Sequence, residues 1–248
     1  MFLPTKEKNY LNLGNDDFEK QIFRIMPVNK LKELFEMKQN TLIKTDMMDD
    51  PFENFILRGR GRLPNGRIVS FGMRDSYFVQ WWTFVRESDA IWRIYTPDKN
   101  GVKIRTTIPK LFESLYGAIS SETRDVTCFI GKIAYLHNIK MKKYLEEPLS
   151  LDSSGVELAR QLLFKRQFFR HEKEVRLIYG AEGALAQSKI FRYEINPYEL
   201  IEQIVFDPRM EESLFKEHKE YFRNSGFKKR IYQSSIYRPP ENIIKNIL

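Results

Sequence analysis

The stretch HEKEVRLIY, residues 171–179, decides the fold class of this 248-residue chain. Its second part, EVRLIY, is rich in β-prone residues and predicts a strand that begins at Glu174. Two more strand-like runs follow it, SKIFRYEI at 188–195 and LIEQIVFDP at 200–208. Three consecutive late strands predict an antiparallel sheet, and therefore an α+β class rather than a doubly wound parallel sheet.

Upstream of this stretch, strand-like and helix-like runs alternate irregularly. We expect an α+β fold with a mixed, mainly antiparallel sheet and flanking helices, in which residues 1–20 are a loosely held arm and residues 21–248 one domain. Asn40 is expected to end the first helix. Strands are predicted over 19–27, 41–46, 77–84, 101–107 and 126–136, a hairpin at the Asn-Gly pair within 62–71, and helices over 28–40, 87–95, 108–119 and 153–169.

The composition predicts an ordered protein with an anionic partner. Hydrophobic residues make up 42% of the chain, which is typical of a globule with a sizeable core. The formal net charge of +8 favours nucleic acid or a phosphate-rich ligand. No run approaches the roughly 20 apolar residues of a membrane span, and the first residues lack a signal-peptide pattern. We therefore expect a cytoplasmic protein without membrane contact, in which the single cysteine, Cys128, is a buried hydrophobe.

Common catalytic signatures are absent from the sequence. It has no dinucleotide-binding, P-loop, zincin or nucleophile-elbow motif. Its three histidines are dispersed, so no metal site is predicted. The best candidate for a nucleic-acid contact is RGRGR, where Arg58, Arg60 and Arg62 alternate with glycines that let the backbone approach phosphate closely.

Three stretches carry a resemblance to a known family. They are YFVQWWTFVRESDAIWRIYTPDKNGVKIRTTIPKLFESL at 77–115, FKRQFFRHEKEVRLIY at 164–179 and IEQIVFDPRM at 201–210. Together they resemble the bacterial family catalogued as domain of unknown function 2971, from about Phe23 to Met210. That family supplies no reaction, so a function has to come from the layout of the motifs.

The order and spacing of these motifs are similar to those of the NAD-consuming ADP-ribosyltransferases. The resemblance implies an ADP-ribosyltransferase-like fold with NAD as a substrate. It assigns Arg24, in the first strand, to the adenosine side of NAD. It also assigns a nicotinamide-binding role to the helix that follows YFVQWWTF, with Ser88, Trp92 and Tyr95 as the nearest matches.

The same resemblance makes Glu174 the catalytic glutamate, with Glu172 two residues before it. Cleavage of the nicotinamide-ribose bond passes through an oxocarbenium-like state, which a carboxylate beneath the ribose stabilises. Alternation along a strand would place Glu172 on the same side, where it could orient or deprotonate the acceptor. The implied activity is NAD-dependent ADP-ribosylation of a macromolecule, with nucleic acid favoured over protein, in phage defence or as a toxin.

Two other functions stay open. A Mg²⁺-dependent nuclease would use Glu172, Glu174, Asp89 and Asp50 as oxygen ligands. A non-catalytic module would bind nucleic acid or another partner through RGRGR and exposed aromatic side chains.

The proposed site residues also have structural interpretations. The charged residues 172–176 could face solvent on an edge strand, and Arg24 could pair with Asp49 or Asp50. Asp207, in FDPRM, is interpreted as a turn residue. Tryptophans belong to the core more often than to a ligand-binding surface, and this interpretation applies to Trp81, Trp82 and Trp92.

Overall fold

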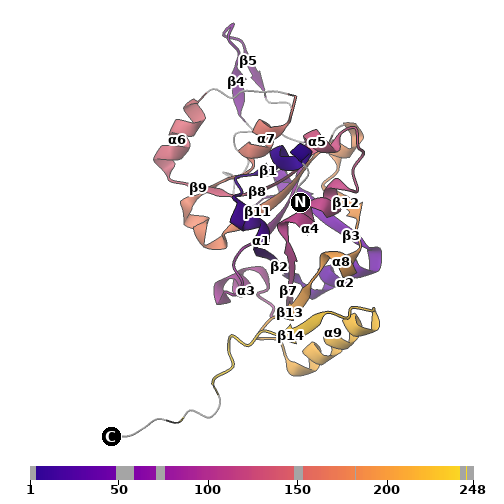
Figure 1. Ribbon diagram of the computed structural model, residues 1–248. Coiled ribbons are helices and arrows are strands. Elements are labelled where there is room, and N and C mark those ends of the chain that lie inside the picture. Colours follow the sequence, from indigo (N-terminus) through magenta and orange to yellow (C-terminus); the bar gives the residue numbers. More distant parts are fainter. Residues whose placement is uncertain are drawn as a thin grey trace, which may run out of the picture.

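The computed structural model describes residues 4–48, 59–70, 76–147, 153–181, 183–240 and 244. Its centre is one large sheet whose main path runs β1-β8-β11-β6-β2-β7-β13-β14, with β3 beside β6 and β12 beside β3 (Figure 1). The strands of this sheet are β1 (Tyr10–Leu11), β2 (Gln21–Pro27), β3 (Gln39–Lys44), β6 (Tyr77–Thr83), β7 (Gly101–Thr107), β8 (Cys128–Lys132), β11 (Glu174–Gly180), β12 (Ile190–Glu194), β13 (Gln203–Phe206) and β14 (Arg230–Gln233).

The sheet is mainly antiparallel, which confirms the predicted α+β class. β11 is a central strand, antiparallel to β6 on one side and to β8 on the other. Two described pairs within this sheet, β1 with β8 and β13 with β14, run parallel. β11 begins at Glu174, as EVRLIY predicted.

The sheet splits where β6 changes its partner. At its carboxyl end β6 pairs with β2 through Thr83 and Phe23, whereas at its amino end it pairs with β3 through Val79 and Ile43. β2 and β3 therefore leave the same edge of β6 in different directions. The stretch of β6 between these two contacts includes Trp81.

Helices cover both faces of the sheet. On one face, residues such as Leu31, Phe112 and Phe222 from helices pack with sheet residues that include Trp82 and Leu177. On the opposite face, one cluster joins Ile91 and Trp92 to β2 and β13, and another joins α7 to β6, β8 and β11. The helices are α1 (Asn15–Glu19), α2 (Val28–Met37), α3 (Asp89–Tyr95), α4 (Ile108–Tyr116), α5 (Arg124–Thr127), α6 (Asn138–Glu146), α7 (Val156–Gln161), α8 (Pro197–Leu200) and α9 (Glu212–Asn224).

Short elements complete the fold. The hairpin predicted at the Asn-Gly pair is present, and Figure 1 shows it standing clear of the large sheet. None of the helices in the described ranges has the length and apolar character needed to cross a membrane. The remaining elements are the strands β4 (Arg60–Arg62), β5 (Ile68–Ser70), β9 (Ala134–Leu136) and β10 (Phe164–Arg166), and the 3-10 helices η1 (Pro4–Asn9), η2 (Thr45–Met47), η3 (Gln167–Glu172) and η4 (Gly183–Gln187).

The three late strands, β11, β12 and β13, do not pair with one another, so the predicted pairing among them is wrong. β11 pairs with β6 and β8, β12 with β3, and β13 with β7 and β14. Each late strand is instead placed beside a strand from earlier in the chain, so the antiparallel order comes from long-range pairing.

Three element boundaries also differ from the prediction. The first helix ends at Met37 because Lys38 takes a left-handed conformation with φ 50°, and Asn40 belongs to β3. The run 126–136 is two strands, β8 and β9, which Ile133 separates. The helix predicted over 153–169 is limited to Val156–Gln161, and residues after it form β10 and η3. The apolar periodicity of that run indicates a helix and gives no sign that β10 pairs with β9 as a strand.

Residues 9–17 of the predicted arm pack against the domain. β1 pairs with β8, and the side chains of Asn9, Leu11 and Asp17 are buried. Asn9 donates to the carbonyl oxygens of Asp125 and Cys128 at 2.9 and 2.7 Å. Lys132 in β8 forms an ion pair with Asp17 at 2.6 Å. This part of the segment is fixed by contacts with residues more than a hundred positions away.

We expect Gly131→Ala to destabilise the protein through this packing. A Cβ at Gly131 would lie 2.4 Å from Leu163 Cδ1 and 2.9 Å from the Leu11 carbonyl oxygen, so β1 would have to move. Overpacking of this kind costs about 1–3 kcal/mol, which urea unfolding would measure. Gly14→Ala is the control, since the nearest atom to its added Cβ lies at 4.0 Å. Equal unfolding free energies for the two variants would contradict the close approach of β1.

Candidate active site

Glu174 lies at the first position of β11, where two cations hold its carboxylate. Its side chain is 5% exposed, and Oε1 accepts from Arg176 Nε at 2.8 Å and lies 2.7 Å from Nη2. Oε2 lies 3.4 Å from Lys165 Nζ. Arg176 shares the face of β11 with Glu174 by strand alternation and also donates to the Leu162 carbonyl oxygen at 2.7 Å. Arg176 thus holds one oxygen of the carboxylate and Lys165 lies near the other, so the two cations together orient the group.

Glu172 belongs to the same cluster, but it is not placed there by strand alternation as the sequence predicted. It is the last residue of η3, and Lys173 has a left-handed φ of 42°, so Glu172 is not a strand residue. The Thr83 hydroxyl donates to the Glu172 carbonyl oxygen, which ties this turn to the end of β6. Glu172 Oε2 lies 2.7 Å from Lys165 Nζ. One lysine therefore bridges the two carboxylates that strand alternation alone was expected to align.

The two glutamates line a cavity of about 520 Å³, which we call the glutamate cavity. Its polar wall holds the Glu172, Glu174, Lys165 and Arg176 cluster, and the rest of its wall is apolar and aromatic apart from Arg166. The lining residues are Ile43, Met47, Met48, Val79, Trp81, Ile94, Tyr95, Lys165, Arg166, Phe169, Glu172, Glu174 and Arg176.

Arg24 lines a second cavity of about 360 Å³, which we call the arginine cavity. Within the described residues Arg24 forms no hydrogen bond or ion pair, and its buried Nε has no partner. Burial lowers the pKa of this guanidinium because desolvation disfavours the charged form. The pairing with Asp49 or Asp50 involves residues outside the described ranges. The cavity is formed by α2, β2, β3 and β12, with Trp81 and Tyr95 in its wall.

Trp81 and Tyr95 line both cavities and stack on each other. Their ring centroids are 4.2 Å apart with an interplanar angle of 26°. The Arg24 guanidinium carbon lies 5.9 Å from the centroid of the Trp81 ring. In β6, Trp81 is paired with Arg176 of β11, next to the pair of Thr83 with Glu174. The stacked pair is thus the common wall between the arginine and the carboxylates.

The split in the sheet explains how Arg24 reaches this wall. Strand alternation places Arg24 on the face of Ile22 and Met26, opposite to the face that carries Trp81 and Glu174. Because β2 and β3 diverge beside Trp81, the sheet is not continuous there, and the guanidinium approaches the ring through the opening. A continuous sheet would keep these side chains apart.

Two of the predicted nicotinamide-binding residues lie elsewhere. Ser88 is the N-cap of α3, where its hydroxyl accepts from the Ile91 amide at 3.4 Å. Trp92 is fully buried among core residues, and its indole donates to Glu87 at 2.6 Å. Neither residue lines the arginine or the glutamate cavity. Tyr95, one turn after Trp92, is the aromatic residue of α3 that lies in the cavity walls.

The basic RGRGR segment is separate from the cavities. Arg58 lies outside the described residues, while Arg60 and Arg62 are exposed on β4. Neither lines the two cavities described above. The hairpin therefore presents its cations to solvent, away from the carboxylate cluster.

The ligand set of a metal-dependent nuclease does not assemble in the described part of the chain. No group of three His, Cys, Asp or Glu side chains there is arranged to hold a metal ion. Asp89 forms an exposed ion pair with Arg93 at 2.9 Å, and Asp50 lies outside the described ranges. Glu172 and Glu174 have Lys165 between them instead of an open space for a cation.

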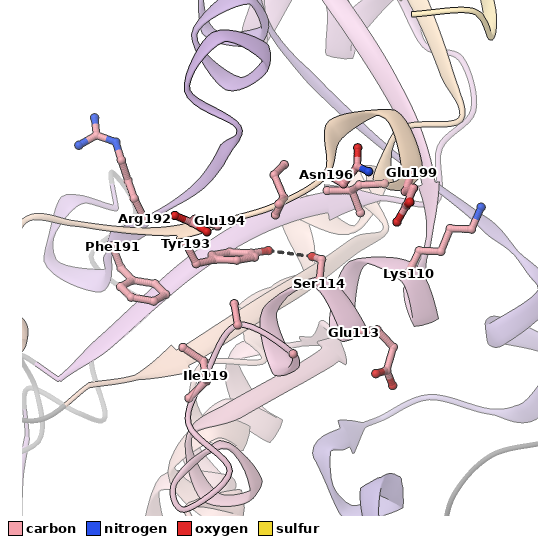
Figure 2. A pocket seen from close by; sticks show the side chains of 14 residues that line it. Lys110, Glu113, Ser114, Ile119, Phe191, Arg192, Tyr193, Glu194, Asn196 and Glu199 are labelled. Atoms are coloured by element: carbon pink, nitrogen blue, oxygen red, sulfur yellow. Dashed lines mark hydrogen bonds between the residues drawn. The ribbon is translucent and has the colours of Figure 1, made fainter.

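A third and larger cavity, of about 800 Å³, lies between α4, β12 and α8 (Figure 2). Figure 2 shows Tyr193 and Ser114 sharing a hydrogen bond of 3.0 Å there. Most of its charged lining residues, such as Glu194 and Glu199, are exposed. None of the predicted site residues lines it. Size alone therefore does not locate the candidate site.

Sequence reasoning missed Lys165 and Trp81 as site residues. Lys165 is nearly buried and belongs to β10, in a region expected to be helical. Trp81 was grouped with the core tryptophans, whereas Trp82 alone of this adjacent pair is fully buried. Alternation along β6 could have identified Trp81, because adjacent residues of a strand point to opposite faces. Two adjacent tryptophans therefore cannot both face the same side of the sheet.

Comparison with known proteins leaves the family open. No family model matches the sequence. No curated protein matches it either. Among solved structures, Thermus sp. 2.9 DarT in complex with NAD+ aligns with a TM-score of 0.37 and 10% identity over 87% of this chain and 95% of that chain. Thermus sp. 2.9 DarT in complex with ADP-ribosylated ssDNA gives 0.39 and 11% over 90% and 96%. Likeness at this level does not determine a function.

We expect Arg176→Met to destabilise the protein by about 3–5 kcal/mol, because it leaves the buried Glu174 carboxylate without its main partner. Chemical denaturation would measure the change. Arg192→Met is the control, since Arg192 pairs with Glu33 at 3.4 Å on the surface, where such pairs contribute about 0–1 kcal/mol. The double variant Glu174→Gln with Arg176→Met should recover part of the loss. A cost for Arg176→Met no larger than the control would contradict the buried pair.

Proposed function

We propose that this chain is an NAD-dependent ADP-ribosyltransferase that modifies a macromolecular acceptor, with nucleic acid favoured over protein. One observation carries the proposal. An arginine with no anionic partner among the described residues and a pair of carboxylates lie in two cavities that share the Trp81–Tyr95 wall. This arrangement offers the cation, the aromatic surface and the anion that one NAD molecule requires, in the order in which NAD carries the matching groups.

In the proposed complex, the arginine cavity holds the adenosine and phosphate side of NAD. The Arg24 guanidinium, which has no anionic partner among the described residues, can donate two parallel hydrogen bonds to a phosphate or ribose oxygen. A bound anion would also supply the counter-charge that burial of this group lacks. The volumes of both cavities lie in the range typical of small-molecule sites.

The nicotinamide and its ribose would lie at the stacked aromatic wall and the glutamate cavity. Tyr95 and Trp81 offer a surface on which the planar nicotinamide can stack. Glu174 is then the group that faces the ribose. Its contacts with Arg176 and Lys165 keep the carboxylate in place, so little reorganisation is needed when positive charge develops.

The proposed reaction transfers the ribose carbon from nitrogen to an acceptor. The bond between ribose C1′ and the nicotinamide nitrogen breaks, and its electron pair leaves with neutral nicotinamide. The resulting oxocarbenium-like centre is stabilised by Glu174. A nucleophilic atom of the acceptor bonds to C1′ and loses a proton. Glu172, with 16% of its side chain exposed against 5% for Glu174, is the carboxylate that we assign to this proton.

The charge of the chain favours nucleic acid as the acceptor. The net charge is +8, and the exposed Arg60 and Arg62 on the β4–β5 hairpin can contact phosphates. Modification of nucleic acid would suit a toxin or a phage-defence protein, and membership in the family of domain of unknown function 2971 is part of the same proposal. A non-catalytic nucleic-acid module is the second candidate, which the same exposed arginines favour.

We expect wild-type protein to release nicotinamide from NAD when a nucleic-acid acceptor is present, and Glu174→Gln to reduce the rate by about 100-fold or more. Arg24→Met should weaken NAD binding by about 10- to 100-fold, as loss of a charged hydrogen-bond donor predicts. Radiolabelled NAD, with separate detection of nicotinamide and labelled acceptor, measures both effects.

Glu199→Gln is the matched control, because Glu199 is an exposed glutamate that lines the third cavity. Its turnover should equal that of the wild type. Loss of activity in Glu199→Gln with full activity in Glu174→Gln would move the site to the third cavity. Binding of nucleic acid without NAD turnover in any variant would favour the non-catalytic module.

The hairpin arginines give a separate prediction for the acceptor. Replacing both Arg60 and Arg62 with Gln should weaken binding of single-stranded nucleic acid while leaving binding of NAD unchanged. Loss of two phosphate contacts at roughly 0.7 counterions each lowers the slope of log K against log salt by about 1.4. Fluorescence anisotropy at several salt concentrations measures that slope. An unchanged slope would place the acceptor on another surface.

A further inference from the structure

α3 is a short helix that needs external support to hold Tyr95 in the cavity wall. It has seven residues, and Tyr95 is the last of them. Helices of this length are not stable alone in water, because few hydrogen bonds offset the cost of forming the first turn. Fraying would begin at the terminal residues, among which is Tyr95. The stacking of Tyr95 on Trp81 therefore depends on what fixes the carboxyl end of α3.

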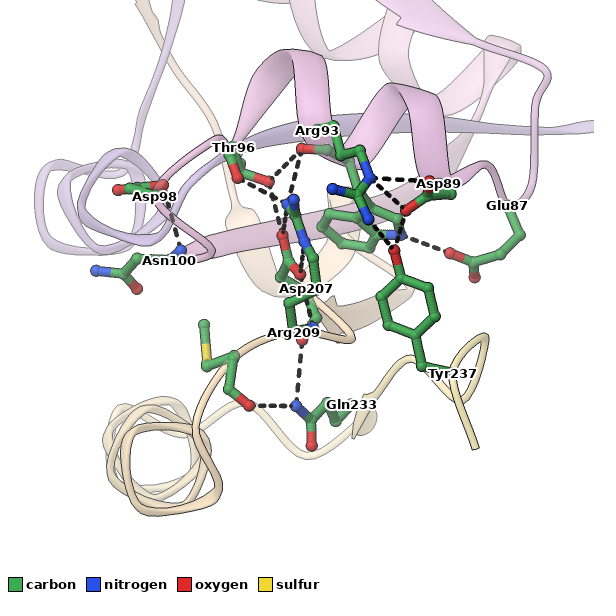
Figure 3. A network of polar contacts seen from close by, with 12 residues as sticks. Glu87, Asp89, Arg93, Thr96, Asp98, Asn100, Asp207, Arg209, Gln233 and Tyr237 are labelled. Carbon is green, nitrogen blue, oxygen red and sulfur yellow. Dashed lines mark hydrogen bonds and ion pairs between the residues drawn. The ribbon is translucent and has the colours of Figure 1, made fainter. Parts of the chain in front are cut away.

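A buried ion pair supplies that support. Asp207, directly after β13, is fully buried and accepts from Arg209 Nε at 3.0 Å, with Arg209 Nη2 at 2.6 Å from its second oxygen. The same Nη2 donates to the carbonyl oxygens of Thr96 and Trp92 at 2.8 and 3.2 Å. These carbonyls lie at the carboxyl end of α3, where a cation is favourable. Figure 3 shows Arg209 between Asp207 and the end of the helix.

Thr96 connects this ion pair to α3 a second time. Its hydroxyl lies 2.9 Å from Asp207 Oδ2 and 2.8 Å from the Trp92 carbonyl oxygen. Gly101 makes room for it, because a Cβ there would lie 2.3 Å from the Thr96 methyl group. The Asp207 amide donates to the Gly101 carbonyl oxygen at 3.0 Å. Thr96, Asp207 and Arg209 thus form one unit, which we call the α3 clamp.

The amino end of α3 is held by a different buried charge. Lys103 of β7, with 3% of its side chain exposed, lies 2.8 Å from Glu87 Oε2. Glu87 Oε1 accepts from the Trp92 indole at 2.6 Å. This contact fixes the segment before α3 and the core side of the helix. It does not reach Tyr95, which lies at the other end of the helix, beside the α3 clamp, and packs against the cluster of Ile25, Ile91, Trp92 and Val205.

We propose that Asp207 and Arg209 are positioning residues for the proposed NAD site, which act by holding Tyr95 against Trp81. This inference rests on the proposed function and extends it to two residues that touch neither cavity. It also gives FDPRM, interpreted above as a turn, a role in ligand binding. Asp207 accepts from the Arg209 amide at 2.8 Å, as in a turn, while its carboxylate orients the guanidinium toward α3.

The test is a double-mutant cycle on NAD binding, measured by calorimetry with Arg209→Met, Tyr95→Ala and the variant that combines them. Arg209→Met should weaken binding by about 2- to 10-fold, since it leaves one aromatic side chain to be ordered by the ligand. In the Tyr95→Ala background it should have no further effect. Arg93→Met is the matched control, because Arg93 is an exposed arginine of the same helix paired with Asp89. If Arg209→Met weakens NAD binding by the same factor with and without Tyr95→Ala, the proposal is overturned.

Hydrogen exchange separates this inference from the proposed function. The Thr96 amide donates to the Trp92 carbonyl oxygen at 2.9 Å, and its exchange should quicken in Arg209→Met but not in Arg93→Met. If wild-type protein does not bind NAD, the proposed function fails, and faster exchange at Thr96 still supports the clamp. Unchanged exchange overturns it. Thr96→Val, which keeps the side-chain shape, repeats both measurements if Arg209→Met does not fold.

Discussion

The structure depends on a buried carboxylate that is held by two cations. Glu174 begins the central strand β11, and Arg176 on the same face of that strand takes its charge. Lys165 extends the pair to Glu172 from a strand of a separate small sheet. Removing one partner from such a cluster is costly, because the remaining charge stays buried. The same contacts that make the cluster costly to disrupt keep both carboxylates at the wall of a cavity.

The split of the sheet brings Arg24 close to the aromatic wall beside this cluster. A continuous sheet would separate Arg24 from Glu174, since alternation places them on opposite faces. β2 and β3 diverge beside Trp81, and the two cavities share the Trp81–Tyr95 wall. Glu33, the acidic residue that lines the arginine cavity, pairs with Lys30 and Arg192. Among the described residues Arg24 therefore has no anionic partner, whereas the glutamate cavity holds two carboxylates. A ligand with phosphates at one end and a developing cation at the other satisfies both.

Local features of this fold were predictable from the sequence, and contacts between distant elements were not. The strand at Glu174 and the Asn-Gly hairpin depend on a few neighbouring residues, and both are present. Lys165 could not be found this way, because its role depends on a strand pairing within a run that has helical periodicity. Only the position of α3 on the sheet shows that Tyr95, and not Trp92, lies in the cavity walls. Helical spacing alone leaves both residues as candidates.

The two walls of the candidate site are held by different means, and this separates their energetics. Ionic contacts within the site itself orient the carboxylates, so a change there alters charge and position together. The aromatic wall is oriented from outside, by the α3 clamp at one end of the helix and by Lys103 and Glu87 at the other. Under the proposed function, substitutions in the clamp would move Tyr95 without altering the charges at Glu174. Binding of nicotinamide could then be measured separately from stabilisation of the cation.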